Sequence, residues 1–278
     1  MRQKIIKLIK GITPPLILDL AKKSVTSLRP AGKPLSPSWH TIKDGGLKGH
    51  NIFLDPIGDW QQAMTSGTYD DFIFGYLKKT DLSGKVIFDV GSHIGYHALY
   101  FAQLVGDGGK VVSFEPNMFN VERIRLNLEK NKNLSGHITL IEKAISDISG
   151  STEFVISDKV DKGSSSGSFL SNADTFFQKD IYEKSFGFKK VNVETITLDE
   201  FSRSTGLLPD FVKLDIEGAE YLALEGAKNI LSQKKPIFLI EIHSIFNMYK
   251  VYEILKQYNY KIELLKEEAD GRCFVAAQ

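Results

Sequence analysis

Residues 86–95 read Val-Ile-Phe-Asp-Val-Gly-Ser-His-Ile-Gly, a short apolar run that leads into a turn with two glycines. The length and composition of the run predict a buried strand. Apolar residues from Ile94 to Val105 then recur at helical spacing and predict a helix that packs on a sheet. Glycine tolerates unusual torsions and lets a ligand approach the backbone closely. The stretch therefore predicts a strand, a ligand-binding turn and a helix.

The same alternation of strand, turn and helix continues down the chain. Apolar runs that predict further strands occur at residues 110–114, 137–141, 211–214 and 237–242. A single helix is expected over residues 219–231, and a closing antiparallel pair over residues 260–265 and 273–277. This order is typical of an α/β fold with a doubly wound, mostly parallel, Rossmann-like sheet.

Composition excludes some classes of partner. The chain has 35 Lys and Arg against 34 Asp and Glu, a formal net charge of +1, so no overall field would attract nucleic acid. A single cysteine, Cys273, cannot form an internal disulfide, which favours a reducing compartment and a cytoplasmic location. No apolar run approaches the ~20 residues that a membrane-spanning helix needs.

Residues 1–50 are expected to form an N-terminal extension ahead of a catalytic domain at residues 51–278. Basic residues near the start alternate with apolar ones, which predicts an amphipathic helix. Residues 1–30 could lie on the inner face of a membrane, or pack on the domain or on a second subunit of a homo-oligomer. Residues 29–50 are rich in proline and glycine and are interpreted as a connector.

An atypical stretch at residues 157–190 is interpreted as an insertion. A Gly/Ser run at 163–168 precedes six aromatic residues: Phe169, Phe176, Phe177, Tyr182, Phe186 and Phe188. A solvated linker would not carry so many rings. A lid over the acceptor site is favoured over a surface insertion with its own apolar cluster, because long loops in compact domains are usually functional.

The glycine turn and the strand after it predict a nucleoside site. Glu115 ends that next strand, where a carboxylate can accept hydrogen bonds from two ribose hydroxyls. The G-x-G-x-x-G spacing of dinucleotide sites and the glycine-rich phosphate loop are both absent. Asp89 would repel a pyrophosphate but favour the ammonium group of a methionine moiety. S-adenosylmethionine (SAM) is therefore the expected ligand.

A second group of polar residues follows the strands at 211–214 and 237–242: Lys213, Asp215, Glu217, Glu241 and His243. The ends of parallel strands meet at one edge of a sheet, so these side chains are expected to line one crevice. The alternative is structural, with Glu217 capping the next helix and Lys213 in an ion pair.

His243, or failing it Asp215 or Glu217, is the expected base that accepts the proton of an acceptor hydroxyl. Lys213 completes the predicted catalytic set. A metal ion held by Asp215, Glu217, Glu241 and His243 is an alternative, but no fixed ligand spacing supports it, so no metal ligand is assigned.

These motifs resemble those of the FkbM-type SAM-dependent O-methyltransferases over residues 67–278. The shared segments are Gly67–Asp70, Asp89–Gly91 with Gly95-Tyr96, Phe114–Pro116, Lys143–Asp147, Phe211–Glu220 and Glu241. The run Lys-Leu-Asp-Ile-Glu-Gly-Ala-Glu at 213–220 is the most diagnostic. The resemblance implies a seven-stranded sheet with an antiparallel last strand, SAM as methyl donor, and hydroxyl acceptors that are often sugars.

The resemblance also implies roles for individual residues. Asp89, Gly91 and Gly95 would face the methionine end of SAM, Glu115 the ribose, and Ala144 the adenine. Ser92 and His93 belong to the same turn and are expected at the cofactor. They stand where the family commonly has Ala-Asn, which leaves the contact made by His93 open.

The sequence thus predicts a SAM-dependent methyltransferase that acts on a hydroxyl of a sugar or glycan precursor. The expected partner is a small-molecule or glycan acceptor, and nucleic acid is not expected. One alternative is a non-catalytic nucleoside-binding scaffold in a surface-polysaccharide assembly complex. An NAD-dependent dehydrogenase is a further alternative, which the glycine spacing disfavours.

Overall fold

The computed structural model describes residues 37–54, 59–157, 167–174, 188–233 and 236–278. The predicted amphipathic helix within residues 1–36 lies outside this range. Most of the predicted lid does as well, because residues 158–166 and 175–187 are not described. Among the described helices, none is long and apolar enough to cross a membrane.

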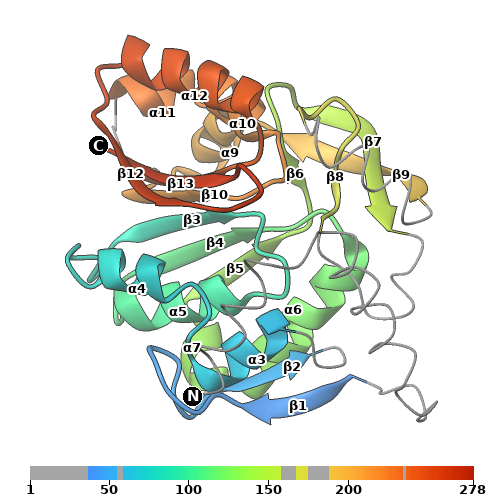
Figure 1. The fold of residues 1–278 in the computed structure, drawn as a ribbon, viewed down its shortest axis with the longest axis vertical. Coiled ribbons are helices and arrows are strands. Elements are labelled where there is room, and N and C mark those ends of the chain that lie inside the picture. Colours follow the sequence, from blue (N-terminus) through green and yellow to red (C-terminus); the bar gives the residue numbers. More distant parts are fainter. Residues whose placement is uncertain (1–36, 55–58, 158–166, 175–187, 234–235) are drawn as a thin grey trace, which may run out of the picture. The chain divides into compact units, whose positions relative to one another are not determined.

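A seven-stranded sheet forms the centre of the described domain (Figure 1). Its strands, in spatial order, are β12 (Ile262–Glu267), β13 (Cys273–Ala277), β11 (Ile237–Ile242), β10 (Phe211–Leu214), β3 (Val86–Val90), β4 (Lys110–Phe114) and β5 (Ile138–Ile141). Strands β5, β4, β3, β10 and β11 run parallel to one another, whereas β13 is antiparallel to both of its neighbours, β11 and β12. The predicted α/β sheet with an antiparallel last strand is confirmed.

The strand order creates a switch point between β3 and β10. From β3 the chain winds outward through β4 and β5, and it then returns to β10 and winds the other way through β11 and β13. Ligands of open α/β sheets bind beyond the carboxyl ends of the strands at such a point. The predicted glycine turn after β3 and the predicted polar group after β10 are both placed there.

Helices cover both faces of the sheet (Figure 1). One face carries α9 (Leu198–Thr205), α10 (Glu220–Glu225), α11 (Lys228–Gln233) and α12 (Ile245–Gln257); the other carries α4 (Asp71–Leu77) and α5 (Tyr96–Val105). Each face of the sheet has its own hydrophobic core. Adjacent strand residues point to opposite faces, so Phe88 packs in the core beneath α9–α12 and Ile87 in the core beneath α4 and α5. The remaining helices are α3 (Asp59–Ser66), α6 (Met118–Lys130) and α7 (Lys132–Ser135).

The helix predicted over residues 219–231 is divided into α10 and α11. The Gly226 carbonyl accepts a hydrogen bond from the Asp199 amide, and the Asp199 carboxylate accepts from the amides of Asn229 and Ile230 at 2.8 and 3.0 Å. A side chain from α9 thus satisfies the free donors at the start of α11. Periodicity alone does not reveal such a distant cap.

Part of the predicted connector is ordered into a hairpin. Strands β1 (Ser38–Thr41) and β2 (Asn51–Leu54) pair in antiparallel fashion. The Phe53 amide donates to Asn127 Oδ1 at 2.7 Å, and the Asn51 amide donates to Asn131 Oδ1 at 3.0 Å, which joins β2 to α6 and the residue after it. Residues 29–50 were expected to be a connector, but residues 38–50 form strand β1 and the turn that leads to β2.

A second, four-stranded sheet lies beside the central one. It consists of β6 (Ala144–Ile145), β9 (Phe188–Ile196), β7 (Gly150–Ser157) and β8 (Phe169–Leu170) in that order. The described part of the insertion supplies β8, whose Leu170 packs with Phe154 and Leu222 in a small apolar cluster. The structure thus places β8 in a sheet, and the function of the insertion stays a prediction.

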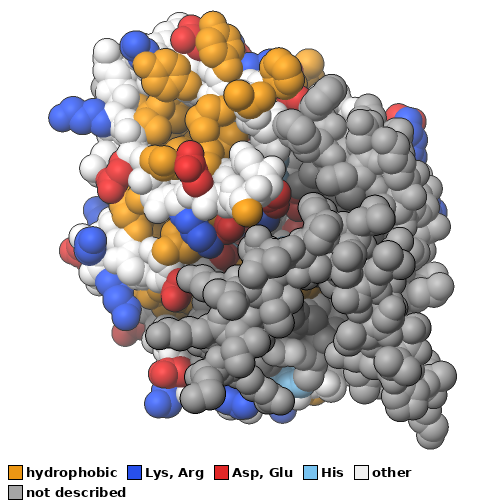
Figure 2. Space-filling model, in the orientation of Figure 1, with side chains coloured by type: hydrophobic (Ala, Val, Ile, Leu, Met, Phe, Trp, Pro, Cys, Tyr) orange, Lys and Arg blue, Asp and Glu red, His pale blue; other side chains and the backbone are white. Residues whose placement is uncertain are grey.

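Charged side chains are interspersed on the face drawn in Figure 2, where the described residues form no continuous basic surface. This distribution agrees with the near-zero net charge. Apolar side chains gather on the same face over α12, whose exposed residues include Ile245, Phe246 and Tyr249.

Candidate active site

The turn after β3 has a left-handed backbone at three positions. Gly91, His93 and Gly95 have φ values of 81°, 52° and 82°. At Gly91 a Cβ atom would lie 1.8 Å from the carbonyl oxygen of Asp215, so only glycine lets the end of β3 meet the end of β10. The amides of Gly91 and Ser92 both donate to the Phe114 carbonyl at 3.1 Å. The turn is therefore held against both neighbouring strands.

Glu115 lies at the end of β4 and reaches back to the glycine turn. Its carboxylate accepts hydrogen bonds from the His93 amide at 2.8 Å, the Asn117 amide at 3.0 Å and the Asn120 side chain at 3.1 Å. Burial raises the pKa of Glu115 to about 7, although the three donors favour its charged form. The sequence analysis did not identify Asn117 and Asn120, which hold this carboxylate in place.

The remaining polar residues of the turn have different environments. The Ser92 hydroxyl donates to the Asp89 carbonyl at 2.8 Å and accepts from Ser113 at 2.6 Å. Burial lowers the pKa of His93 to about 4, so its ring is neutral at neutral pH. Asp89 is fully buried, and neither of its carboxylate oxygens accepts a hydrogen bond from the described residues. Its charged neighbour is the ammonium group of Lys213, 3.8 Å from Oδ1, and Asp89 lies behind the residues that line the large cavity.

Ala144 lies in a small apolar cavity that adjoins the turn. Phe114, Leu170 and Ile216 also line this cavity, together with Gly91 and Asp215. Apolar walls of this kind suit an aromatic base. Ala144 and Gly91 therefore line the same cavity, and the adenine contact of Ala144 stays a prediction.

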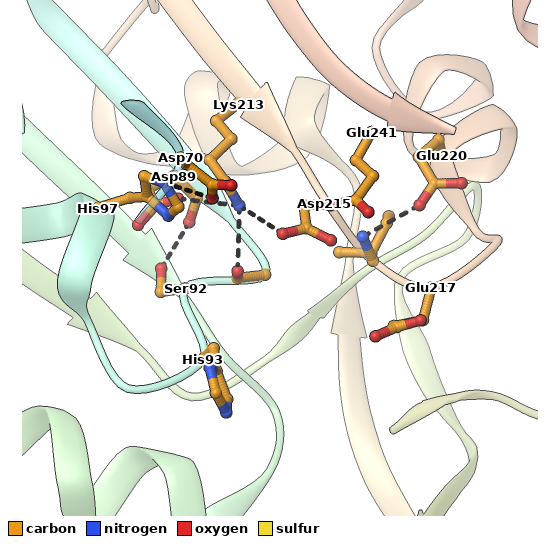
Figure 3. Close-up of polar contacts among 12 residues, drawn as sticks. Asp70, Asp89, Ser92, His93, His97, Lys213, Asp215, Glu217, Glu220 and Glu241 are labelled. Atoms are coloured by element: carbon orange, nitrogen blue, oxygen red, sulfur yellow. Dashed lines mark hydrogen bonds and ion pairs between the residues drawn. The ribbon is translucent and has the colours of Figure 1, made fainter. Parts of the chain in front are cut away.

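Lys213 is buried between the ends of β3 and β10 (Figure 3). Its ammonium group lies 3.0 Å from Asp215 Oδ2, 3.4 Å from the Gly91 carbonyl oxygen and 3.8 Å from Asp89 Oδ1. Burial would lower the pKa of Lys213, but the Asp215 and Asp89 carboxylates outweigh it and raise the pKa. The predicted ion-pair alternative is observed, and Lys213 stays protonated rather than accepting a proton.

His243 is enclosed by four carboxylates. Its Nδ1 lies 3.0 Å from Glu220 Oε1, and its Nε2 lies 3.4 Å from Glu217 Oε2 and 3.7 Å from oxygens of both Asp215 and Glu241. Although burial opposes the charge, Glu220 and then Glu217 raise the pKa of His243 well above its usual value. A histidine that is already protonated cannot act as the predicted base.

Glu220, the first residue of α10, holds the turn before that helix, and the start of α10 has no side-chain cap. The Glu220 carboxylate accepts from the amides of Ile216 and Gly218 at 3.0 and 3.1 Å and from the side chain of Asn247. Glu217 has a left-handed backbone, with φ of 56°, and its carboxylate reaches the cavity beside Asp215 and Glu241 (Figure 3). The alternative in which Glu217 serves only as a helix cap is therefore wrong.

Arg272 joins the site from the turn between β12 and β13. Its guanidinium donates to Glu241 Oε1 at 2.5 Å and to Asp270 Oδ2 at 2.9 Å. Burial and then Asp215 raise the pKa of Glu241 to about 8, against the opposing effects of His243 and Arg272. No local motif of the sequence distinguishes Arg272 from other surface arginines.

One cavity of about 610 Å³ brings the two predicted groups together. Gly91, Ser92, His93 and Glu115 line it from the side of the glycine turn, and Lys213, Asp215, Glu217, Glu241 and His243 line it from β10 and β11. Tyr69 and Asp70, from the segment before α4, form part of the same wall. A cavity of this size can accommodate a nucleoside-sized ligand.

Comparisons with known proteins identify the family. Residues 89–262, more than half of the chain, match the Methyltransferase FkbM domain. Hexuronic acid methyltransferase AglP of Haloferax volcanii is 26% identical over 190 residues, which cover 66% of this chain and 67% of that protein.

Two solved structures give weaker similarities. Methyltransferase FkbM from Methylobacillus flagellatus KT is 18% identical with a TM-score of 0.49, covering 70% of this chain and 43% of that chain. The alignment therefore spans less than half of that protein. An O-methyltransferase from Bacillus cereus in complex with SAH is 10% identical with a TM-score of 0.44, covering 99% and 96% of the two chains. From the match to the FkbM domain, we conclude that the chain belongs to the FkbM methyltransferase family, as its motifs predicted.

Proposed function

We propose that this protein transfers the methyl group of SAM to a hydroxyl group of a sugar or glycan precursor. The observation that carries the proposal is the single cavity in which the glycine turn and Glu115 face the carboxylates of β10 and β11. Membership of the FkbM family supports the methyl-transfer chemistry. The similarity to a hexuronic acid methyltransferase supports a sugar acceptor.

The donor half of the cavity is formed by residues of the turn and of β4. Glu115 would accept the ribose hydroxyls, the Asp89 carboxylate would attract the methionine ammonium group, and Ala144 would contact the adenine. Bound SAM supplies a methyl group on a positively charged sulfur. The buried carboxylates near the turn favour such a cation.

The acceptor half needs a group that removes the hydroxyl proton. Glu217 is our candidate, because its side chain is 22% exposed, lines the cavity and lies next to the fully enclosed His243. In the transfer, the acceptor oxygen gives its proton to Glu217 and bonds to the methyl carbon, while the carbon–sulfur electron pair stays on sulfur. Much of the barrier is lowered by holding these atoms in line.

SAM binding is expected to weaken roughly tenfold for each pH unit below about 7. The reason is that Glu115, with its pKa raised to about 7, becomes protonated as the pH falls and loses its capacity to accept from two hydroxyls. Calorimetric titration with SAM between pH 5.5 and 8 measures the effect. Glu115→Gln should bind weakly at every pH without this dependence. An equal slope in both proteins would remove Glu115 from ribose recognition.

Glu217→Gln is expected to slow methyl transfer by about 100-fold or more while SAM affinity stays unchanged. The amide keeps the size of the side chain but cannot accept the hydroxyl proton. Single-turnover transfer from methyl-labelled SAM to hexuronic acids and hexuronic-acid oligosaccharides measures the rate. Glu225→Gln is the control, because Glu225 lies on the outer side of α10 and pairs with exposed Lys228.

The assay also separates this function from the scaffold alternative. A folded protein that binds SAM but methylates none of these sugars would contradict transfer to a glycan hydroxyl. Equal rates for Glu217→Gln and the wild type would exclude Glu217 as the base.

A further inference from the structure

We propose that Asp215, Glu241 and His243 form a binding site for a divalent metal ion of the Mn²⁺ class. One side-chain ligand atom from each residue lies within 4.8 Å of the other two. The inference rests on the proposed function and extends it, because the ion would bind the acceptor hydroxyl beside the methyl donor.

The distances fit the coordination shell of a small ion. Bonds of about 2.1 Å in an octahedron place neighbouring ligand atoms about 3.0 Å apart and opposite ones about 4.2 Å apart. His243 Nε2 lies 3.7 Å from Asp215 Oδ1 and 3.7 Å from Glu241 Oε1, between these limits. Glu217 Oε2, at 3.4 Å from Nε2, borders the same point. These atoms therefore surround a space of suitable size.

The outer contact of His243 is typical of a metal ligand. Glu220 is fully buried and anchored by the Ile216 and Gly218 amides, so it can only accept a hydrogen bond from Nδ1–H of His243. This contact fixes the ring and directs Nε2 into the cavity. The side chain of His243 is 1% exposed, and Nε2 lies 3.4 Å from Glu217 Oε2. Histidine ligands almost always have such a carboxylate or carbonyl on the other ring nitrogen.

Asp215 also keeps an oxygen available. Lys213 binds Asp215 through Oδ2, which leaves Oδ1 facing His243. Glu241 Oε1, the oxygen that faces His243, also accepts from Arg272, whose side chain is 36% exposed and would share this oxygen with the ion. Four carboxylates face His243, and their negative charge favours a cation at Nε2, where a bound metal ion would take the place of the proton of the histidine. A dication placed at Nε2 would compensate this charge.

The ligand types select the class of ion. Carboxylates and an imidazole suit first-row divalent ions such as Mn²⁺, whereas Ca²⁺ takes oxygen ligands alone. The described residues contain no thiolate beside this group. An ion held by three side chains keeps positions open for the acceptor oxygen, whose pKa it would lower. Glu217 would then receive the proton.

The test is a titration of the full chain with Mn²⁺, in which the electron paramagnetic resonance signal of the free ion measures how much Mn²⁺ is unbound. About one saturable site per chain is expected. Glu241→Gln and Asp215→Asn should lose it, and Glu220→Gln should weaken it by about 10- to 100-fold through the misplaced His243. Glu153→Gln is the matched control, because Glu153 pairs with Lys190 on the second sheet and both side chains are exposed.

Titration of the same samples with SAM separates this inference from the proposed function. Normal SAM binding by Glu241→Gln would show that this variant is folded. Loss of Mn²⁺ binding in the same variant would then support the ion site. Saturable Mn²⁺ binding that survives in Glu241→Gln and Asp215→Asn would overturn it. Wild-type protein that binds SAM but no Mn²⁺ would overturn the ion site alone, whereas binding of Mn²⁺ without SAM would overturn the proposed function.

Discussion

Gly91→Ala is expected to abolish SAM binding and to lower the free energy of unfolding by about 2–6 kcal/mol. The left-handed backbone at Gly91 strains any side chain, and the new Cβ would lie 1.8 Å from the Asp215 carbonyl oxygen. The Asp215 amide donates to the Val90 carbonyl at 3.1 Å, so the two strand ends cannot separate without losing this bond. The change would therefore displace both walls of the cavity at once.

Gly108→Ala is the control that separates the effect of backbone strain from the effect of the clash with the Asp215 carbonyl oxygen. Gly108 has φ of 86°, and a Cβ there would meet nothing within 4 Å, so this variant is expected to lose only about 1–2 kcal/mol. Urea unfolding gives the stabilities, and calorimetry gives the affinity for SAM. If Gly91→Ala proved as stable as Gly108→Ala and still bound SAM, the contact between the ends of β3 and β10 would not be essential.

The sequence was sufficient to predict the sheet and the place of the site. Each parallel strand is a short apolar run, and alternate residues such as Ile87 and Phe88 pack on opposite faces. The glycine turn and the run at 213–220 are local patterns, so their position at the ends of β3 and β10 could be inferred without the structure. The same local patterns led to the family.

Contacts between distant segments could not be predicted in this way. Arg272 reaches Glu241 across 31 positions, and Asp199 caps α11 from a similar separation. The pairing of β2 with Asn127 and Asn131 spans more than 70 positions and converts part of an expected connector into a hairpin. Periodicity describes only neighbours along the chain, so it contains no information about these partners.

The role of His243 shows the same limit at the site itself. Its place after β11 predicts that it lies in the crevice, which the structure shows. Its pKa is raised by Glu220 and Glu217, which belong to another segment of the chain. The left-handed backbone of Glu217 sets the direction of that side chain, and hydrogen bonds from backbone amides hold the Glu220 carboxylate. The sequence therefore predicts where His243 lies but not the charge of its ring.

Lys213→Met is expected to lower the free energy of unfolding by about 3–5 kcal/mol, because it leaves Asp89 and Asp215 without their shared cation. Methionine retains most of the side-chain volume, so the loss would come from charge and not from a cavity. Lys190→Met removes the same charge from an exposed ion pair with Glu153 and should cost less than about 1 kcal/mol.

A second substitution shows whether the buried carboxylates cause the loss. Lys213→Met combined with Asp89→Asn removes one of the two charges that Lys213 neutralises, and it should recover part of the stability relative to Lys213→Met alone. Urea unfolding at low and high salt measures all three proteins, and the effect of Lys213→Met should persist at high salt because the pair is shielded from solvent. Full stability of Lys213→Met would contradict a structural role. The buried lysine would then have to be explained by the chemistry of the cavity.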